Sequence, residues 1–111
     1  MAVAKHKLNT IKSGDTFDGA VFQLSVNGAA LNLTGYGITL EFRRQAEAQG
    51  QPDLAMTISD GLSLVDAAAG RFQIDPQILP LRVGIWHYLV RFVSPTGRVK
   101  TWIEGMIEVA P

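Results

Sequence analysis

The chain has 111 residues, which is room for one domain, and it has no cysteine, which excludes a disulfide scaffold, thiolate metal sites and a cysteine nucleophile. Hydrophobic residues make up 47% and charged residues 18%, a balance that is ordinary for a folded protein and excludes disorder. Ten basic and ten acidic residues cancel, so no basic stripe marks a nucleic-acid surface, and no apolar run approaches the roughly 20 residues of a membrane span. We therefore expect a single domain over residues 1–111, without nucleic-acid or membrane partners, that is made and folded in a reducing cytoplasm.

Short alternations of apolar and polar residues recur along the chain with turn residues between them. They predict strands, in chain order, at residues 8–11, 16–26, 31–33, 36–43, 54–58, 62–64, 72–74, 84–93 and 98–109. This spacing is typical of an all-β sandwich or barrel. We interpret the chain as an Ig-like antiparallel β-sandwich of seven to nine strands.

Several connections are predicted from their turn residues. Asn27-Gly28 favours a two-residue hairpin, because both residues tolerate a positive φ. Asp66 is placed to cap a single helical turn that Gly70 ends. Asp75-Pro76 has the pattern of an N-cap followed by proline at the first helical position, which predicts one short helical turn over residues 75–81.

The last quarter of the chain is its most informative part. Two long alternating runs, 84–93 and 98–109, flank Ser94-Pro95-Thr96-Gly97. Proline second and glycine fourth is a common type I turn arrangement, and such turns build four-residue hairpin loops. The register that follows places Leu89 opposite Trp102 and Trp86 opposite Gly105, with the glycine leaving room for the indole ring.

This register gives the hairpin two different faces. One face of the hairpin is expected to point into the core. The expected core members, each in the dominant apolar phase of its strand, are Phe22, Leu40, Phe42, Trp86, Tyr88 and Ile103. The other face is too apolar for a surface exposed to water, and its candidate interface residues are Ile85, Leu89, Trp102 and Met106, with Arg91 beside Lys100. We interpret that face as a partner-binding surface; the alternative is that a loop such as residues 45–53 covers Trp102.

No residue pattern indicates an active site. His6 and His87 have no carboxylates at metal-ligand spacing. Glu104 and Glu108 would stand ~13 Å apart on a strand, farther than the ~5–9.5 Å of paired glycosidase carboxylates. The serines lack a nucleophile-elbow context and a histidine–acid pair. We expect a protein that is not an enzyme and has no cofactor, no metal and no small-molecule substrate.

A family resemblance rests on turn glycines and core aromatics taken in order. The segments that carry it are IKSGDTF (11–17), FQL (22–24), LTGY (33–36), DAAAGRF (66–72), GIWHY (84–88) and EGMIEV (104–109). Together they resemble the N-terminal β-sandwich domain of phage baseplate upper proteins and related small prophage tail proteins. The resemblance covers nearly the whole chain, and its motifs indicate a fold more than a function.

The resemblance implies a virion structural module, assembled in the bacterial cytoplasm, that docks a receptor-binding apparatus onto the tail baseplate and tends to multimerise. Its partners would be other phage tail or baseplate proteins and further copies of itself. Those proteins continue into a helical stalk, whereas this sequence ends at Pro111. We therefore expect a tail, baseplate or head–tail accessory subunit and put less weight on receptor binding. The alternative is a cell-surface adhesion or carbohydrate-binding β-sandwich module, against which the missing export signal counts.

Overall fold

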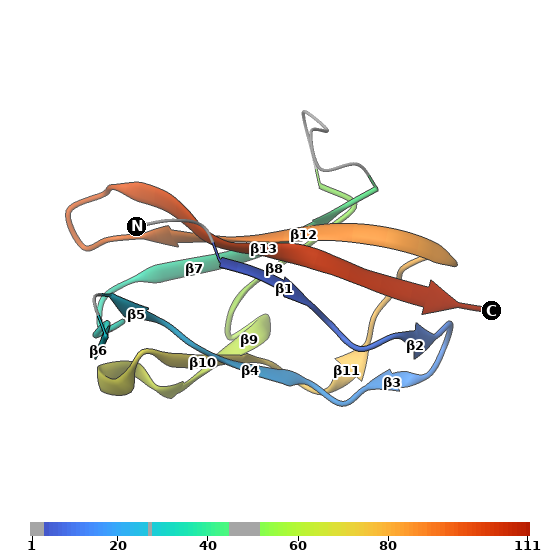
Figure 1. Ribbon diagram of the computed structural model, residues 1–111, viewed down its shortest axis with the longest axis horizontal. Helices are drawn as coiled ribbons and strands as arrows, with labels where there is room; N and C mark the ends of the chain where they lie inside the picture. The colour runs from blue at the N-terminus through green and yellow to red at the C-terminus, as the bar shows by residue number, and fades with distance from the viewer. Residues whose placement is uncertain (1–3, 27, 45–51) are drawn as a thin grey trace.

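One long sheet curls over on itself and makes both layers of the fold (Figure 1). The structure, a computed structural model, describes residues 4–26, 28–44 and 52–111. Neighbouring strands along the sheet are, in order, β1 (Ala4–Lys7), β13 (Val99–Ala110), β12 (Gly84–Val93), β7 (Gly37–Arg43), β8 (Leu54–Ile58), β9 (Gly61–Asp66), β10 (Arg71–Ile74) and β4 (Ala20–Gln23). β2 (Ile11–Lys12) also pairs with β13. Two small sheets join β11 (Gln77–Ile78) to β3 (Thr16–Phe17) and β5 (Ser25–Val26) to β6 (Ala29–Ala30).

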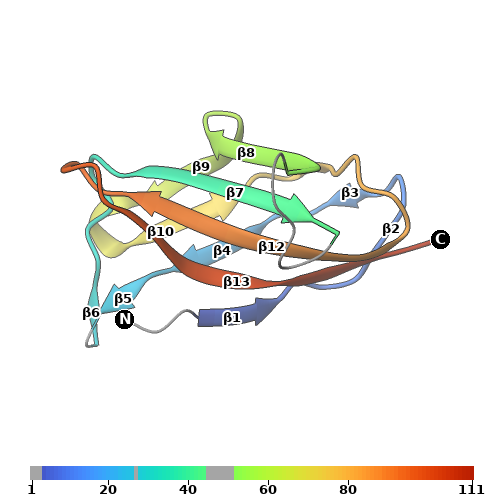
Figure 2. The ribbon, with the colours of Figure 1, turned by 90° about the horizontal axis from the view of Figure 1, so that it is seen from above.

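The two layers meet at the corner between β8 and β9. On one side of this corner β7, β12, β13 and β1 lie side by side, and on the other side β10 and β4 form the second layer (Figure 2). The corner needs Gly61, because its φ is +98° and a Cβ there would stand 2.9 Å from Cγ of Met56. The turn between β8 and β9 therefore depends on glycine at position 61.

The all-β sandwich-like fold predicted from the sequence is confirmed. Among the described residues, eight strands contain four residues or more, within the predicted range of seven to nine. The pairing is not purely antiparallel, because β1 and β2 run parallel to β13, and β8 runs parallel to β9. Alternation within a strand indicates which face is buried but carries no information on the direction of its neighbour.

Two of the predicted turns are confirmed. β5 and β6 pair with Val26 opposite Ala29, and Gly28 has a positive φ of 81°. A 3₁₀ turn, η1 (Ala67–Ala69), is capped by Asp66, whose side chain accepts a hydrogen bond from the backbone N–H of Ala69. Gly70 ends this turn in the left-handed conformation. Local turn chemistry was sufficient to predict both connections.

The predicted helical turn over residues 75–81 is wrong, and the segment is extended. The Asp75 carboxylate accepts hydrogen bonds from the Ser63 hydroxyl at 2.6 Å and from the Gln73 amide at 3.1 Å, so it does not cap a helix. Leu79 and Leu81, two residues apart, are both buried. Burial at a spacing of two is the period of an extended chain, and these tertiary contacts outweigh the local helix-start signal.

The core lies between the two layers and contains every residue predicted for it, since Phe22, Leu40, Phe42, Trp86, Tyr88 and Ile103 are all buried. Phe72 of β10 joins the layers. Its ring stacks on Phe22 of the same layer at 5.2 Å between centroids and meets Phe92 of the opposite layer edge-on at 5.6 Å.

The predicted register of the β12–β13 hairpin is wrong at its tip. Val93 pairs with Val99, so five residues rather than four form the loop. The backbone N–H of Ser94 donates to the carbonyl of Arg98 at 2.8 Å, and the Ser94 hydroxyl accepts from the N–H of Arg98 at 3.1 Å. The serine side chain thus stabilises a wider loop than the Pro-Thr-Gly sequence alone predicted.

A β-bulge changes the register a second time. Val90 pairs with Ile103 but Arg91 pairs with Thr101, which leaves Trp102 as the extra residue. Beyond the bulge the pairing is offset by two residues from the prediction: Leu89 faces Glu104, Trp86 faces Ile107, His87 faces Met106 and Tyr88 faces Gly105. The predicted contacts of Leu89 with Trp102 and of Trp86 with Gly105 are therefore both wrong.

Candidate functional site

The bulge divides the six predicted interface residues between two faces of the hairpin. Three apolar ones stay on the outer face. Met106 stands opposite His87, and Ile85 and Leu89 are the outward neighbours of His87 along β12, so Met106 lies diagonally between them. Ile85 is 56% exposed and Met106 is 40% exposed. We call Ile85, Leu89 and Met106 the outer patch.

Trp102 does not belong to the outer patch, contrary to the prediction. A bulge places two successive side chains on the same side of the strand, and here Trp102 joins Ile103 on the core side. The Trp102 ring lies 5.2 Å from the buried Phe92 ring and 6.2 Å from Tyr36, centroid to centroid. The alternative cover, residues 45–53, falls largely outside the described residues.

Lys100 also leaves the outer face. It stands opposite Phe92, whose side chain points into the core, whereas Arg91 stands opposite Thr101. Arg91 and Lys100 are therefore on different faces, and the predicted side-by-side arrangement of these two cations is wrong. The extra residue at position 102 is the physical reason, because it reverses the facing of every residue between itself and the loop.

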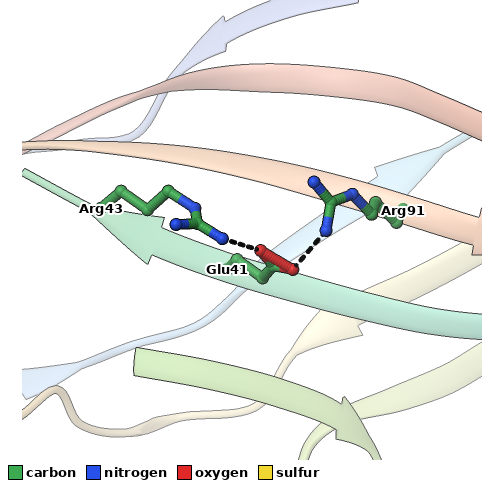
Figure 3. Close-up of polar contacts among 3 residues, drawn as sticks. All are labelled: Glu41, Arg43 and Arg91. Carbon is green, nitrogen blue, oxygen red and sulfur yellow. Dashed lines mark hydrogen bonds and ion pairs between the residues drawn. The ribbon is translucent and has the colours of Figure 1, made fainter. Parts of the chain in front are cut away.

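A buried ion cluster, absent from the sequence-based predictions, borders the outer patch (Figure 3). Glu41 stands opposite Leu89 on the neighbouring strand β7. One of its carboxylate oxygens accepts from Arg43 at 2.9 Å and the other accepts from Arg91 at 2.8 Å. Glu41 and Arg43 are only 7% and 9% exposed, although they lie on the polar phase of β7. Opposite charges two residues apart on one strand were a signal of proximity, but not of burial.

The ion cluster pairs opposite charges and does not present a free catalytic group. Both oxygens of Glu41 are engaged by guanidinium groups, so this carboxylate is not poised as a general base or a metal ligand. The Arg91 side chain, 42% exposed, extends the cluster to the surface next to Leu89. The Glu41–Arg91 ion pair joins β7 to β12 at the border of the outer patch.

A second candidate surface is a pocket at the tip of the β12–β13 hairpin. The loop of this hairpin is at the left end of the molecule in Figure 1. This hairpin pocket has a volume of about 560 Å³ and is lined by Tyr36, Phe92, Ser94, Thr96, Arg98, Lys100 and Trp102. The turn before β7 packs against the hairpin loop here. A Cβ on Gly35, whose φ is +81°, would stand 3.1 Å from Cγ of Pro95. Glycine at this position therefore lets the two loops approach and brings Tyr36 beside Trp102.

The part of the chain that the structure describes contains few other candidate functional groups. There, no group of three or more histidine, aspartate or glutamate side chains could hold a metal ion. Burial raises the pKa of the Tyr88 phenol, which packs in the core against Phe42. No described helix is long and apolar enough to cross a membrane.

No family model and no curated protein sequence matches this chain. The residues from which a resemblance to phage baseplate proteins is expected include turn and core positions. Gly14, Gly35 and Gly70 all have a positive φ, and Phe72 is fully buried. These are positions at which the backbone or the core dictates the residue, so they bear on the fold more than on a partner.

Proposed function

We propose that this protein is a non-enzymatic structural subunit of a phage or prophage virion, in the tail, baseplate or head–tail region, and that it acts through protein–protein contacts. Its partners are further copies of itself or other tail and baseplate proteins, and it is assembled into the virion in the bacterial cytoplasm. The resemblance of its turn and core residues to baseplate upper proteins supports the virion assignment. The outer patch is the single observation that carries the interaction role.

The outer patch has the character of an interface core. Ile85 and Met106 are exposed and Leu89 is half-buried, and all three stand on two long, paired strands, so their positions do not need to be ordered on binding. Each Å² of apolar surface that a partner removes from water contributes roughly 25 cal/mol of favourable hydrophobic free energy. Arg91 of the ion cluster lies at the border of the outer patch, and arginine and methionine are both enriched at interfaces.

The border of the outer patch carries both signs of charge. Arg91 lies on the β7 side, and Glu104 and Glu108 lie on the β13 side, opposite Leu89 and Ile85 respectively. A face that carries both signs of charge can be complementary to a second copy of itself about a two-fold axis. This arrangement supports self-association as the first contact to test.

A single charge placed in the outer patch tests the proposal. Met106→Glu should weaken self-association or partner binding, because it would bring a charged carboxylate into an apolar contact. Val21→Glu on β4 is the matched control, since Val21 is exposed in the other layer. Light scattering after size-exclusion chromatography, alone and with the products of neighbouring genes, measures assembly. A wild-type protein that stays monomeric and ignores those products would contradict the interaction role, and neighbouring genes unrelated to virions would contradict the virion assignment.

A further inference from the structure

We propose that the hairpin pocket is a binding site for an acidic saccharide. One face of a sugar ring would lie on Trp102 and Tyr36, and the sugar carboxylate would meet Arg98 and Lys100. The site is on the opposite face of the β12–β13 hairpin from the outer patch and shares no residue with it. The inference therefore goes beyond the assembly role and does not rest on it.

The aromatic wall of the pocket is held in place by the core. Trp102 packs on Phe92 at 5.2 Å, with the ring planes tilted by 34°, and Phe92 itself is fully buried. Tyr36 stands at 6.2 Å from Trp102 with a tilt of 43°. Their centroids are too close to admit a ring between them, so a ligand must lie across the two. Aromatic faces attract polarised C–H groups, which line one side of a sugar ring.

Among the described residues, no carboxylate forms an ion pair with either cation of the pocket. The described ion pairs of the chain all involve Glu41, and none involves Arg98 or Lys100. Lys100 and Trp102 lie on the same face of β13, and Arg98 lies just before this strand at the end of the hairpin loop, so all three line the pocket. A guanidinium can bind a carboxylate with two parallel hydrogen bonds, so this arrangement fits a carboxylate next to a ring held on Trp102.

The remaining polar groups favour a sugar over a peptide. The N–H groups of Ser94, Gly97 and Arg98 are already bonded within the hairpin loop, so the loop offers a ligand few backbone donors. The hydroxyls of Ser94 and Thr96 lie 2.9 Å apart and keep further donor and acceptor capacity. Sugar hydroxyls are bound by groups of this kind, whereas an extended peptide depends on backbone pairing.

Net charge distinguishes the saccharide from a nucleic acid. Aromatic rings beside cations also bind single-stranded nucleic acids, but such proteins combine them with a long basic groove. Here ten basic residues balance ten acidic ones, and the pocket contains only Arg98 and Lys100 as cations. A ligand with isolated carboxylates on an otherwise neutral frame matches two cations better than a continuous polyanion.

Tryptophan fluorescence provides the test. The chain has two tryptophans, and Trp86 is buried in the core, so a surface ligand should perturb Trp102. The wild-type protein is titrated with millimolar concentrations of trigalacturonic acid, sialyllactose and a glucuronate-containing tetrasaccharide. At least one should change the emission in a saturable manner. The trimethyl ester of trigalacturonic acid is the matched neutral control and should bind at least about tenfold more weakly than the free acid if that acid is the ligand found.

Variants separate the pocket from the rest of the surface. Arg98→Gln and Lys100→Gln should each weaken saccharide binding, the former by at least about tenfold, while Arg71→Gln on β10 should leave it unchanged. Both pocket side chains are exposed, so these variants should fold normally, and circular dichroism checks this. The inference is overturned if no acidic saccharide binds. It is also overturned if binding survives the Arg98→Gln, Lys100→Gln double variant, or if a thymidine oligonucleotide or a glutamate-rich peptide binds more tightly. The Met106→Glu variant should bind the saccharide normally, so failure of the assembly role and failure of this site are distinguishable.

Discussion

Replacing Glu41 with glutamine should destabilise the fold strongly, although Glu41 lies on the polar phase of its strand. The change removes the negative charge that lies between Arg43 and Arg91. The Arg43–Glu41 pair is buried, with side chains 10% and 9% exposed. Breaking a buried ion pair by removing one partner costs about 3–5 kcal/mol, because the buried charge that remains loses the opposite charge beside it. We therefore expect Glu41→Gln to lose about 3 kcal/mol or more of unfolding free energy.

Arg91→Gln is the matched comparison within the same cluster. The Arg91 side chain is 42% exposed, and Glu41 keeps its ion pair with Arg43 after the change. Ion pairs of this kind are worth at most about 1 kcal/mol and are screened by salt. The predicted difference between the two variants is therefore about 2 kcal/mol, which is a large fraction of the 5–15 kcal/mol typical of a small domain.

Urea unfolding followed by tryptophan fluorescence measures both variants, with an unchanged dependence on denaturant as the check on two-state behaviour. A third variant, Glu41→Leu with Arg43→Leu, removes both buried charges and should recover much of the lost stability, because apolar residues often replace a buried pair without cost. If Glu41→Gln and Arg91→Gln each cost less than about 1 kcal/mol, the cluster is solvated and the reasoning from burial is refuted.

Two further predictions concern the core. Phe42→Ala should cost about 3–5 kcal/mol in urea unfolding, because it empties a fully buried site against Tyr88, whereas Val99→Ala at an exposed site should cost little; equal effects would contradict the assignment of the core. Because burial raises the pKa of the Tyr88 phenol, the folded protein keeps it neutral at pH values where the unfolded chain ionises it. Stability from this group should be complete below about pH 10 and fall by up to about 1.4 kcal/mol per pH unit above it. The difference between wild type and Tyr88→Phe measures this, and an identical alkaline decline in both would contradict it.

The bulge at Trp102 shows what could not be predicted at the candidate site. Alternation along 98–109 is compatible with several registers, and the Ser94–Gly97 turn residues favour the four-residue loop that the structure does not adopt. One extra residue in the strand reversed the facing of Lys100 and moved Trp102 from the outer patch to the hairpin pocket. Hydrogen-bonded pairing between two strands determines register, and no local pattern contains that information.

By itself the sequence determined the positions of the longer strands β7, β8, β12 and β13, the core members Phe42 and Tyr88, and the capped turn between Asp66 and Gly70. The predicted strands at 8–11 and 31–33 are wrong, because the structure has strands at 4–7, 11–12 and 29–30 instead. The features that were predicted correctly depend on a period of two and on the backbone preferences of single residues, which are local properties. Only the tertiary structure decided that Glu41 is buried between two arginines and that residues 75–81 are extended. In both cases a group from another strand takes part, Arg91 of β12 for Glu41 and Ser63 of β9 for Asp75, and these contacts outweigh the polarity or helix-start signal that the segment carries alone.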